Sequence, residues 1–311
     1  MRYNARPGGE FGKWTENNII EVYVTMEEKI SVITPSFNQG EFLEKTILSV
    51  LEQDCPNIEY IVIDGGSTDN SVEIIRKYEK HLAYWVSEPD RGQSDAINKG
   101  FRRATGEIVT WLNSDDFYLP GAVKKVVDYF ARHADVDFVY GDYYLADRQE
   151  RILAKRKSIP FDYNILLYDA NFICQPASFF RKSILDKIGL LDEKFHYLMD
   201  YEFFLRAACN KIKFELIPEF LAAYRFHFTC KAVSGQNECK RAHDFIRDMY
   251  RLKKFKNPVF DSAYLLSLHI FFRLKRYLKL IFARQQMIFT SMPIRYRVAG
   301  WLPGKTGKNP Q

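Results

Sequence analysis

Three clusters of polar, mostly acidic residues have the composition of a binding site for a charged ligand. They are 35–40 (PSFNQG), 64–69 (DGGSTD) and 113–116 (NSDD), and each directly follows a short apolar run. Carboxylates that gather at one place repel one another unless a cation or a set of hydrogen-bond donors lies among them. Mg²⁺ and Mn²⁺ bind carboxylate oxygens together with phosphate oxygens. The clusters therefore predict a divalent metal, Mg²⁺ or Mn²⁺, that is shared with a bound diphosphate.

Each cluster also has a purely structural interpretation. Residues 64–69 could form only a turn between a strand and a helix, with Ser67 or Asp69 capping the helix. Residues 113–116 could likewise be no more than a turn. The convergence of three such clusters, rather than any one of them, favours a binding site.

The elements that would position these clusters alternate along the first part of the chain. Apolar, β-rich runs predict strands at 30–34, 58–63, 84–86 and 107–112. Apolar residues at helical spacing predict helices at 41–53, 71–78 and 94–104. This alternation predicts a parallel sheet that is covered by helices on both faces. Ligands bind beyond the carboxyl ends of the strands in such sheets, which is where the three clusters would lie.

Five motifs carry a family resemblance over residues 30–228. In chain order they are PSFNQG, IDGGSTD, DRGQSDAINKG, WLNSDD and MDYEFFLR. The set resembles the bacterial family 2 glycosyltransferases, whereas any one motif alone is weak. The resemblance implies a Rossmann-like α/β fold of the GT-A type with a mostly parallel central sheet. It also implies a nucleotide-sugar donor, with UDP as the most frequent nucleotide, a divalent metal, and inversion at the anomeric carbon.

The resemblance further implies which residues bind the donor nucleotide. They are Pro35, Ser36, Asn38, Asp64, Ser67, Asp95 and Asp115. Gly65 departs from the family pattern, because a second acid that contacts the base usually follows the position of Asp64. Asp95 also fits a simpler role, since an acid in the first turn of a helix is favoured by the helix dipole.

The adjacent acids Asp115 and Asp116 match the metal-binding motif of the family. One acid would hold the metal and the other the ribose, and we favour Asp116 on the metal and Asp115 on the ribose. His227 lies in a Tyr-Arg-x-His segment that resembles a closing motif of the family. It could touch the metal or the diphosphate, or it could be structural.

The reaction requires one more carboxylate. A direct inverting displacement needs a base that takes the proton of the acceptor hydroxyl as that oxygen attacks the anomeric carbon. The resemblance places this base at Asp200, with Met199 where the family commonly has Glu. An aspartate that merely caps a helix would look the same in the sequence. Gln175 and Pro176 precede a predicted strand near the acceptor side.

The charge of the chain is unevenly distributed. Residues 251–311 contain 13 Lys and Arg and one acid, Asp261, so they carry +12 and the rest of the chain −6 of the net +6. On a helical wheel of 258–289, apolar residues such as Leu274 and Leu278 face away from five basic residues, which are Arg273, Lys275, Arg276, Lys279 and Arg284. This pattern predicts a helix on an anionic membrane surface, with an attachment that weakens as salt rises. A helix packed on the domain with its basic side in water is the alternative, and a nucleic-acid-binding tail is disfavoured.

We divide the chain into an N-terminal arm at 1–28, a GT-A catalytic domain at 29–235 and a helical, basic extension at 236–311. The sequence has no apolar signal segment at its start and no run of 18 uncharged apolar residues. Its five cysteines form no Cys-x-x-Cys pair. These features predict a cytoplasmic protein. The basic amphipathic tail predicts peripheral contact with the inner face of the plasma membrane and disfavours a nucleic-acid partner.

The sequence thus predicts an inverting, metal-dependent glycosyltransferase that uses a nucleotide-sugar, with UDP as the nucleotide by family frequency. Its acceptor would be a hydroxyl of a saccharide or a lipid-linked molecule in cell-surface polysaccharide or glycoconjugate biosynthesis. Two alternatives remain. A nucleotidyltransferase would usually place Arg and Lys directly after the first strand, where PSFNQG has none. A binding protein of the same fold without activity would not need to retain Asp200.

Overall fold

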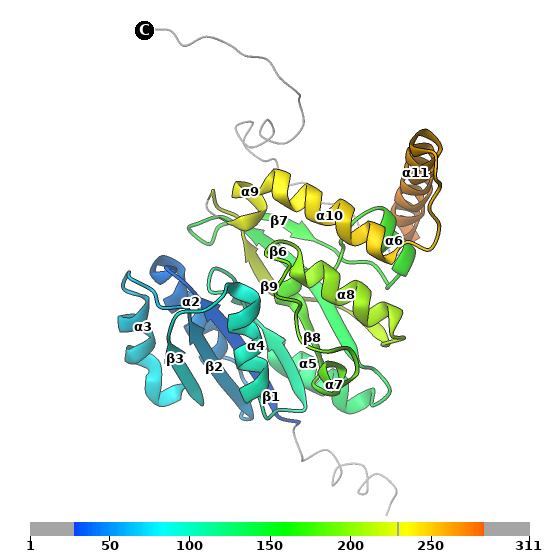
Figure 1. Cartoon of the computed structure of the whole chain (residues 1–311). Coiled ribbons are helices and arrows are strands. Elements are labelled where there is room, and N and C mark those ends of the chain that lie inside the picture. The colour runs from blue at the N-terminus through cyan, green and yellow to red at the C-terminus, as the bar shows by residue number, and fades with distance from the viewer. Residues whose placement is uncertain (1–27, 229, 283–311) are drawn as a thin grey trace, which may run out of the picture.

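A curved, mixed β-sheet forms the centre of the computed structural model, which describes residues 28–228 and 230–282 (Figure 1). The strands are β1 (Ile30–Ser36), β2 (Ile58–Asp64), β3 (Tyr84–Ser87), β4 (Ile108–Trp111), β5 (Phe117–Tyr118), β6 (Phe138–Ala146), β7 (Ile152–Arg156), β8 (Ser178–Arg181) and β9 (Phe214–Arg225). Their order across the sheet is β3-β2-β1-β4-β8-β6-β9-β5, with β7 paired to β6.

Helices connect these strands and cover the sheet. They are α2 (Gly40–Leu51), α3 (Ser71–Tyr78), α4 (Gln93–Arg103), α5 (Ala122–Arg132), α6 (Tyr163–Tyr168), α7 (Ser183–Ile188), α8 (Met199–Cys209), α9 (Lys231–Ser234), α10 (Gln236–Tyr250) and α11 (Pro258–Phe282). Two 3₁₀ turns, η1 (Glu79–His81) and η2 (Gln175–Ala177), complete the set.

The first half of the sheet confirms the fold predicted from the alternation of strands and helices. Strands β3, β2, β1 and β4 are parallel neighbours. The sheet becomes mixed beyond β4, because β8 is antiparallel to both β4 and β6, whereas β9 is parallel to β6. The carboxyl ends of β1, β2 and β4 therefore share one edge, as the sequence predicts.

Both faces of the sheet are buried. Successive residues of a strand point to opposite faces, so Ile33 belongs to one apolar core and Val32 to the other. The first core includes Phe101 of α4 and Phe203 of α8, and the second includes Leu43 of α2. This burial on two sides explains why these strands are continuous apolar runs.

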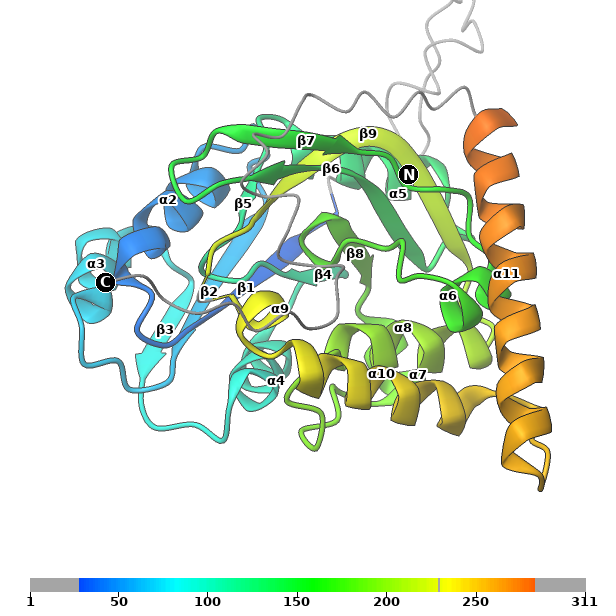
Figure 2. The same cartoon turned by 90° about the horizontal axis from the view of Figure 1, so that it is seen from above.

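The C-terminal extension continues as α10 and α11, and α11 stands at one side of the molecule beside α6 (Figures 1 and 2). None of the helices in the described ranges combines the length and apolarity needed to cross a membrane. The arm predicted at 1–28 lies outside the described residues except for Glu28, and the tail from 283 onward, with Arg284, lies outside them as well.

Candidate active site

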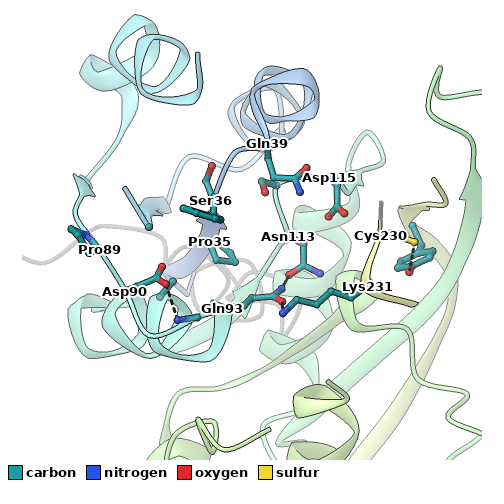
Figure 3. Close-up of a pocket in the computed structure, with 16 residues that line it drawn as sticks. Pro35, Ser36, Gln39, Pro89, Asp90, Gln93, Asn113, Asp115, Cys230 and Lys231 are labelled. Carbon is teal, nitrogen blue, oxygen red and sulfur yellow. Dashed lines mark hydrogen bonds between the residues drawn. The ribbon is translucent and has the colours of Figure 1, made fainter. Parts of the chain in front are cut away.

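A cavity of about 690 Å³ opens at the carboxyl ends of β1, β2 and β4, and we call it the first cavity (Figure 3). The strand-end segments predicted from the sequence line it, together with the loop before α4 and the start of α9. Its lining residues include Pro35, Ser36, Gly65, Asp90, Gln93, Asn113, Asp115, Tyr224 and Lys231.

Two of the three residues predicted on the first loop line this cavity, and the third builds the loop. Pro35 and Ser36 border the cavity, and the Ser36 hydroxyl is buried with no hydrogen-bond partner among the described residues. Buried polar atoms are seldom left unpaired, so the Ser36 hydroxyl is available to a ligand. Asn38 does not line the cavity. Its side chain instead accepts a hydrogen bond from the amide of Thr68, at 2.8 Å, and its own amide donates to the Ser67 hydroxyl.

Asp64 and Ser67 do not line the first cavity, although Gly65 between them does. The Asp64 carboxylate is fully buried and accepts hydrogen bonds from the amides of Gly66 and Ser67. It also accepts from the hydroxyls of Ser67 and Ser87, both at 2.6 Å. Four protein donors thus occupy the two oxygens of Asp64. These hydrogen bonds fix the conformation of the loop after β2.

Asp90 occupies the space that a side chain at position 65 would need. A Cβ atom built on Gly65 would lie 2.4 Å from Oδ2 of Asp90. Asp90 lines the first cavity, and its other oxygen accepts a hydrogen bond from the amide of Gly92 at 2.7 Å. A carboxylate therefore stands beside the position where the family usually has its second acid, although it comes from the loop after β3.

Asp95 lies in the first turn of α4 and does not line the first cavity. Its oxygens accept from the backbone amide of Arg91, at 3.1 Å, and from the guanidinium of Arg91, at 3.0 Å. Burial raises the pKa of Asp95, but the hydrogen bonds and charge of Arg91 outweigh it and leave the pKa below the usual value. The geometry is that of an acid in the first turn of a helix.

The adjacent acids Asp115 and Asp116 have different surroundings. Asp115 lines the first cavity, and its Oδ2 lies 3.1 Å from Nε2 of His227. Asp116 is 1% exposed and accepts from the amide of Arg225 at 2.9 Å and from Asn113 at 3.3 Å. Burial and the neighbouring charge of Asp115 raise the pKa of Asp116. Of the two acids, Asp115 is the one that a ligand in the cavity would meet.

A second cavity of about 250 Å³ adjoins the first and contains Asp200. Asp200 lies in the first turn of α8, and burial raises its pKa, partly offset by backbone hydrogen bonds and the charge of Lys231. Gln175 and Pro176, which the sequence places near the acceptor side, line the same cavity. So does Trp111, whose buried indole nitrogen has no hydrogen-bond partner within the described part of the chain.

Four residues line both cavities and form what we call the shared wall, namely Gln93, Asn113, Tyr224 and Lys231. Lys231 Nζ donates to Oε1 of Gln93 at 2.8 Å, and Gln93 Nε2 donates to Oδ1 of Asn113 at 2.7 Å (Figure 3). The pKa of Lys231 lies below its usual value, because burial lowers it by more than the charges of Asp115, Asp90 and Asp200 raise it. Lys231 and Asp90 are not among the site residues predicted from the sequence. Asp90 had a signal in the DRGQSDAINKG motif, but Lys231 lies in no motif.

A divalent metal fits this site if the bound ligand supplies some of the oxygen atoms that coordinate the metal. The described residues contain no group of three or more His, Cys, Asp or Glu that would hold a metal by itself. Mg²⁺, however, is commonly held by one or two carboxylates together with substrate phosphates and water. Asp115 is such a carboxylate, and His227 holds its orientation.

The mixed α/β fold with this sheet order is the GT-A fold of glycosyltransferases. Solved structures of this class superpose on the chain. S. aureus TarS 1–349 in complex with UDP-GlcNAc has a TM-score of 0.54 at 18% identity, over 78% of this chain and 71% of that one. The longer TarS structure is matched over 39% of its length, with a TM-score of 0.55 at 20% identity and 70% of this chain covered. A mannosyltransferase from Pyrobaculum calidifontis in complex with GDP-Man and Mn²⁺ has a TM-score of 0.55 at 19% identity, over 84% of this chain and 76% of that one.

The sequence comparisons identify the family. The profile of Glycosyl transferase family 2 matches residues 31–189. An uncharacterized glycosyltransferase of Mycobacterium tuberculosis is 32% identical over 268 residues, which cover 84% of this chain and 99% of the relative. The chain belongs to glycosyl transferase family 2.

Proposed function

We propose that residues 29–235 form the catalytic domain of an inverting glycosyltransferase that uses a nucleoside diphosphate sugar, with UDP as the nucleotide. The acceptor would be a hydroxyl of a saccharide or a lipid-linked molecule in bacterial cell-surface polysaccharide or glycoconjugate biosynthesis. One observation carries this proposal. Asp115 and Asp200 lie in two cavities that share a wall, so a donor diphosphate beside Asp115 would place its sugar toward Asp200.

The donor would occupy the first cavity. Ser36 offers a free hydroxyl to the nucleotide, and the carboxylate of Asp90 can accept the N3–H of a uracil base. Asp115 would hold Mg²⁺ or Mn²⁺ together with the diphosphate. This assignment reverses our preference from the sequence for Asp116, because the oxygens of Asp116 already accept hydrogen bonds from Arg225 and Asn113. When bound, the metal supplies positive charge that stabilises the leaving diphosphate.

The acceptor would occupy the second cavity. Asp200 takes the proton of the acceptor hydroxyl, and the acceptor oxygen attacks the anomeric carbon on the side opposite the diphosphate. The bond between this carbon and the diphosphate oxygen breaks, and its electron pair leaves with the nucleoside diphosphate. Lys231, on the shared wall, adds a cation near the departing oxygen. The configuration at the anomeric carbon is inverted.

The raised pKa of Asp200 suits this role. A general base works best when its pKa approaches the operating pH, and burial moves Asp200 in that direction. Turnover should therefore fall as the pH decreases through a pKa above the usual value of about 3.9 for an aspartate.

A ligand screen of the purified full chain tests the proposal. The melting temperature should rise with a UDP-sugar and Mn²⁺, and less with GDP-, TDP- or CMP-sugars, because at equal concentration a ligand that binds more tightly stabilises the folded state more. EDTA should remove most of this shift, and turnover should release UDP. If no nucleotide-sugar changes the melting temperature with or without Mn²⁺, the donor assignment is wrong. Release of pyrophosphate from a nucleoside triphosphate would instead indicate a nucleotidyltransferase.

A further inference from the structure

One face of α11 is apolar and open. Its residues, which we call the α11 apolar face, are each between 44% and 69% exposed, and they are Leu266, Ile270, Phe271, Leu274, Tyr277, Leu278 and Ile281. At 3.6 residues per turn they fall within one arc of about 140° and extend for about 22 Å along the helix. Val259 and Phe260, also exposed, lie in the same arc at the start of the helix. No charged side chain of the described helix falls inside this arc.

The opposite side of α11 docks on the domain through its basic residues. Arg276 and Arg273 pair with the buried carboxylate of Asp169 at 2.5 and 3.4 Å. Lys275 and Lys279 pair with Asp162 at 2.7 and 3.2 Å. These two acids lie at the two ends of α6.

Apolar contacts complete this docking. Phe272 stacks on Tyr168 with the ring centroids 5.6 Å apart. Leu280 is 8% exposed and packs with Ile159 and Ile165. Among the described residues, these contacts with α6 and its neighbours hold α11 in one orientation.

This orientation differs from both interpretations made from the sequence. Each of them left the basic side of the helix free, either for water or for anionic lipid. In the structure, four of the five basic residues on that side are paired with Asp162 and Asp169, and the fifth, Arg284, lies outside the described residues. The free side of α11 is therefore the apolar one.

The charges around the α11 apolar face favour a lipid surface over a second copy of the chain. Arg273 and Lys275, with 46% and 42% of their side chains exposed, lie just outside the two edges of the arc. Lys253, Lys254 and Lys256 are exposed before the helix, and residues 283–311 contain five Lys and Arg and no acid. Two copies that met through this face would bring these cations together, whereas anionic head groups would be attracted to them. Long basic side chains at the edge of an apolar face reach head groups while the apolar residues enter the acyl region.

We propose that the α11 apolar face inserts into the surface of an anionic lipid bilayer and holds the catalytic domain there. Lys253, Lys254 and Lys256 attract the chain to the surface, and the apolar residues provide most of the attachment. Binding should therefore persist at high salt, because salt screens charges but does not weaken the burial of apolar side chains. The helix α10 precedes α11 in the chain and is about 21 Å long. Cys239 near its start lines the second cavity, so α10 links this cavity to the segment that leads into α11.

A flotation assay tests the proposal. The full chain is mixed with vesicles of phosphatidylcholine and phosphatidylglycerol at 0.1 M and at 1 M NaCl. The double variant Ile270→Ser/Leu274→Ser removes apolar side chains that contact solvent in the structure, and Phe245→Ser on α10, also an exposed apolar residue, is the matched control. Equal melting temperatures confirm that all three proteins are folded.

The wild type and Phe245→Ser should float at both salt concentrations, and Ile270→Ser/Leu274→Ser should lose at least tenfold in vesicle affinity. The proposal is overturned if the double variant floats like the wild type, or if 1 M NaCl releases the wild type completely. It is also overturned if the wild type fails to float. In that case, a wild-type dimer that the double variant dissociates would show that this face is an interface between two copies of the chain. If a chain ending at Phe282 floats although the full chain does not, residues 283–311 occupy this face in the full chain.

Discussion

Asp115 and Asp116 show how much the surroundings of a carboxylate decide its chemistry. The two acids are neighbours in the chain, yet only Asp115 lines the first cavity. The amide of Arg225 and the side chain of Asn113 already donate to the oxygens of Asp116, whose pKa is raised by burial and by Asp115. We therefore expect the two positions to respond differently to the same substitution.

Asp115→Asn should weaken Mn²⁺-dependent binding of the donor by roughly tenfold to a hundredfold, which corresponds to about 1.4–2.8 kcal/mol. Asp116→Asn keeps an oxygen that can accept the amide hydrogen of Arg225, so it should change the same affinity by no more than a few-fold. Titration calorimetry with UDP-sugar, with Mn²⁺ and with EDTA, measures both variants. If Mn²⁺ no longer increases donor affinity in Asp116→Asn but still does so in Asp115→Asn, Asp116 is the residue that holds the metal.

At this scale the sequence predicts residue types better than their tasks. Of the residues that the motifs mark, Pro35, Ser36, Asp115 and Asp200 line the cavities. The motifs equally mark Asp64, whose oxygens are occupied by donors of its own loop. A motif shows which residues follow a strand, but it does not show which oxygens the local backbone has already occupied.

Two loops of the sheet edge complement each other. Gly65 after β2 leaves a space beside the first cavity, and Asp90 after β3 fills that space with a carboxylate. Because the loops are 25 residues apart in sequence, only the parallel pairing of β2 with β3 brings them together. We propose that Asp90 takes the place of the acid that the family motif usually has at position 65.

Asp90→Asn should reduce the affinity for UDP by roughly tenfold to a hundredfold, because a hydrogen bond to a charged group contributes about 1.5–3 kcal/mol. The same change should improve binding of CDP, since an amide can donate to N3 of cytosine whereas a carboxylate cannot. Gly65→Ala should also lower the affinity for UDP, because the added Cβ would displace the Asp90 carboxylate. Calorimetry with the two nucleotides measures the effect, and Glu79→Gln on η1 serves as the surface control. Unchanged discrimination between UDP and CDP in Asp90→Asn would exclude Asp90 from contact with the base.

The positions of the strands and helices along the chain could be predicted from the sequence more readily than the contacts between them. Strands β1 to β4 and helices α2 to α4 lie where the apolar periodicity places them, since each must bury an apolar face or stripe against the others. The periodicity of α11 likewise predicts its two faces. It does not predict which face docks, because that depends on Asp162 and Asp169, about a hundred residues away in the chain.

We propose that the whole molecule combines two functions of different physical origin, catalysis and attachment to a lipid surface. The parallel part of the sheet positions the first cavity, and helix α8 brings Asp200 to the second. The shared wall couples the two cavities, and α10 connects this region to α11 (Figure 2). A bilayer beneath the α11 apolar face would hold the catalytic domain at a lipid surface, where a lipid-linked acceptor is located.

The central claim is that the first cavity binds the donor and that Asp200 in the second performs the proton transfer. The most direct test measures donor affinity and turnover on the same preparation of Asp200→Asn, with Asp192→Asn, a half-buried acid that pairs with Lys194, as control. The affinity for UDP-sugar and Mn²⁺ should stay within a few-fold of the wild type, while kcat falls by about 10²–10⁴-fold. The acidic limb of the wild-type pH profile, set by the raised pKa of Asp200, should disappear from the residual activity. Turnover of Asp200→Asn within a few-fold of the wild type, or loss of donor affinity in parallel with turnover, would contradict the account.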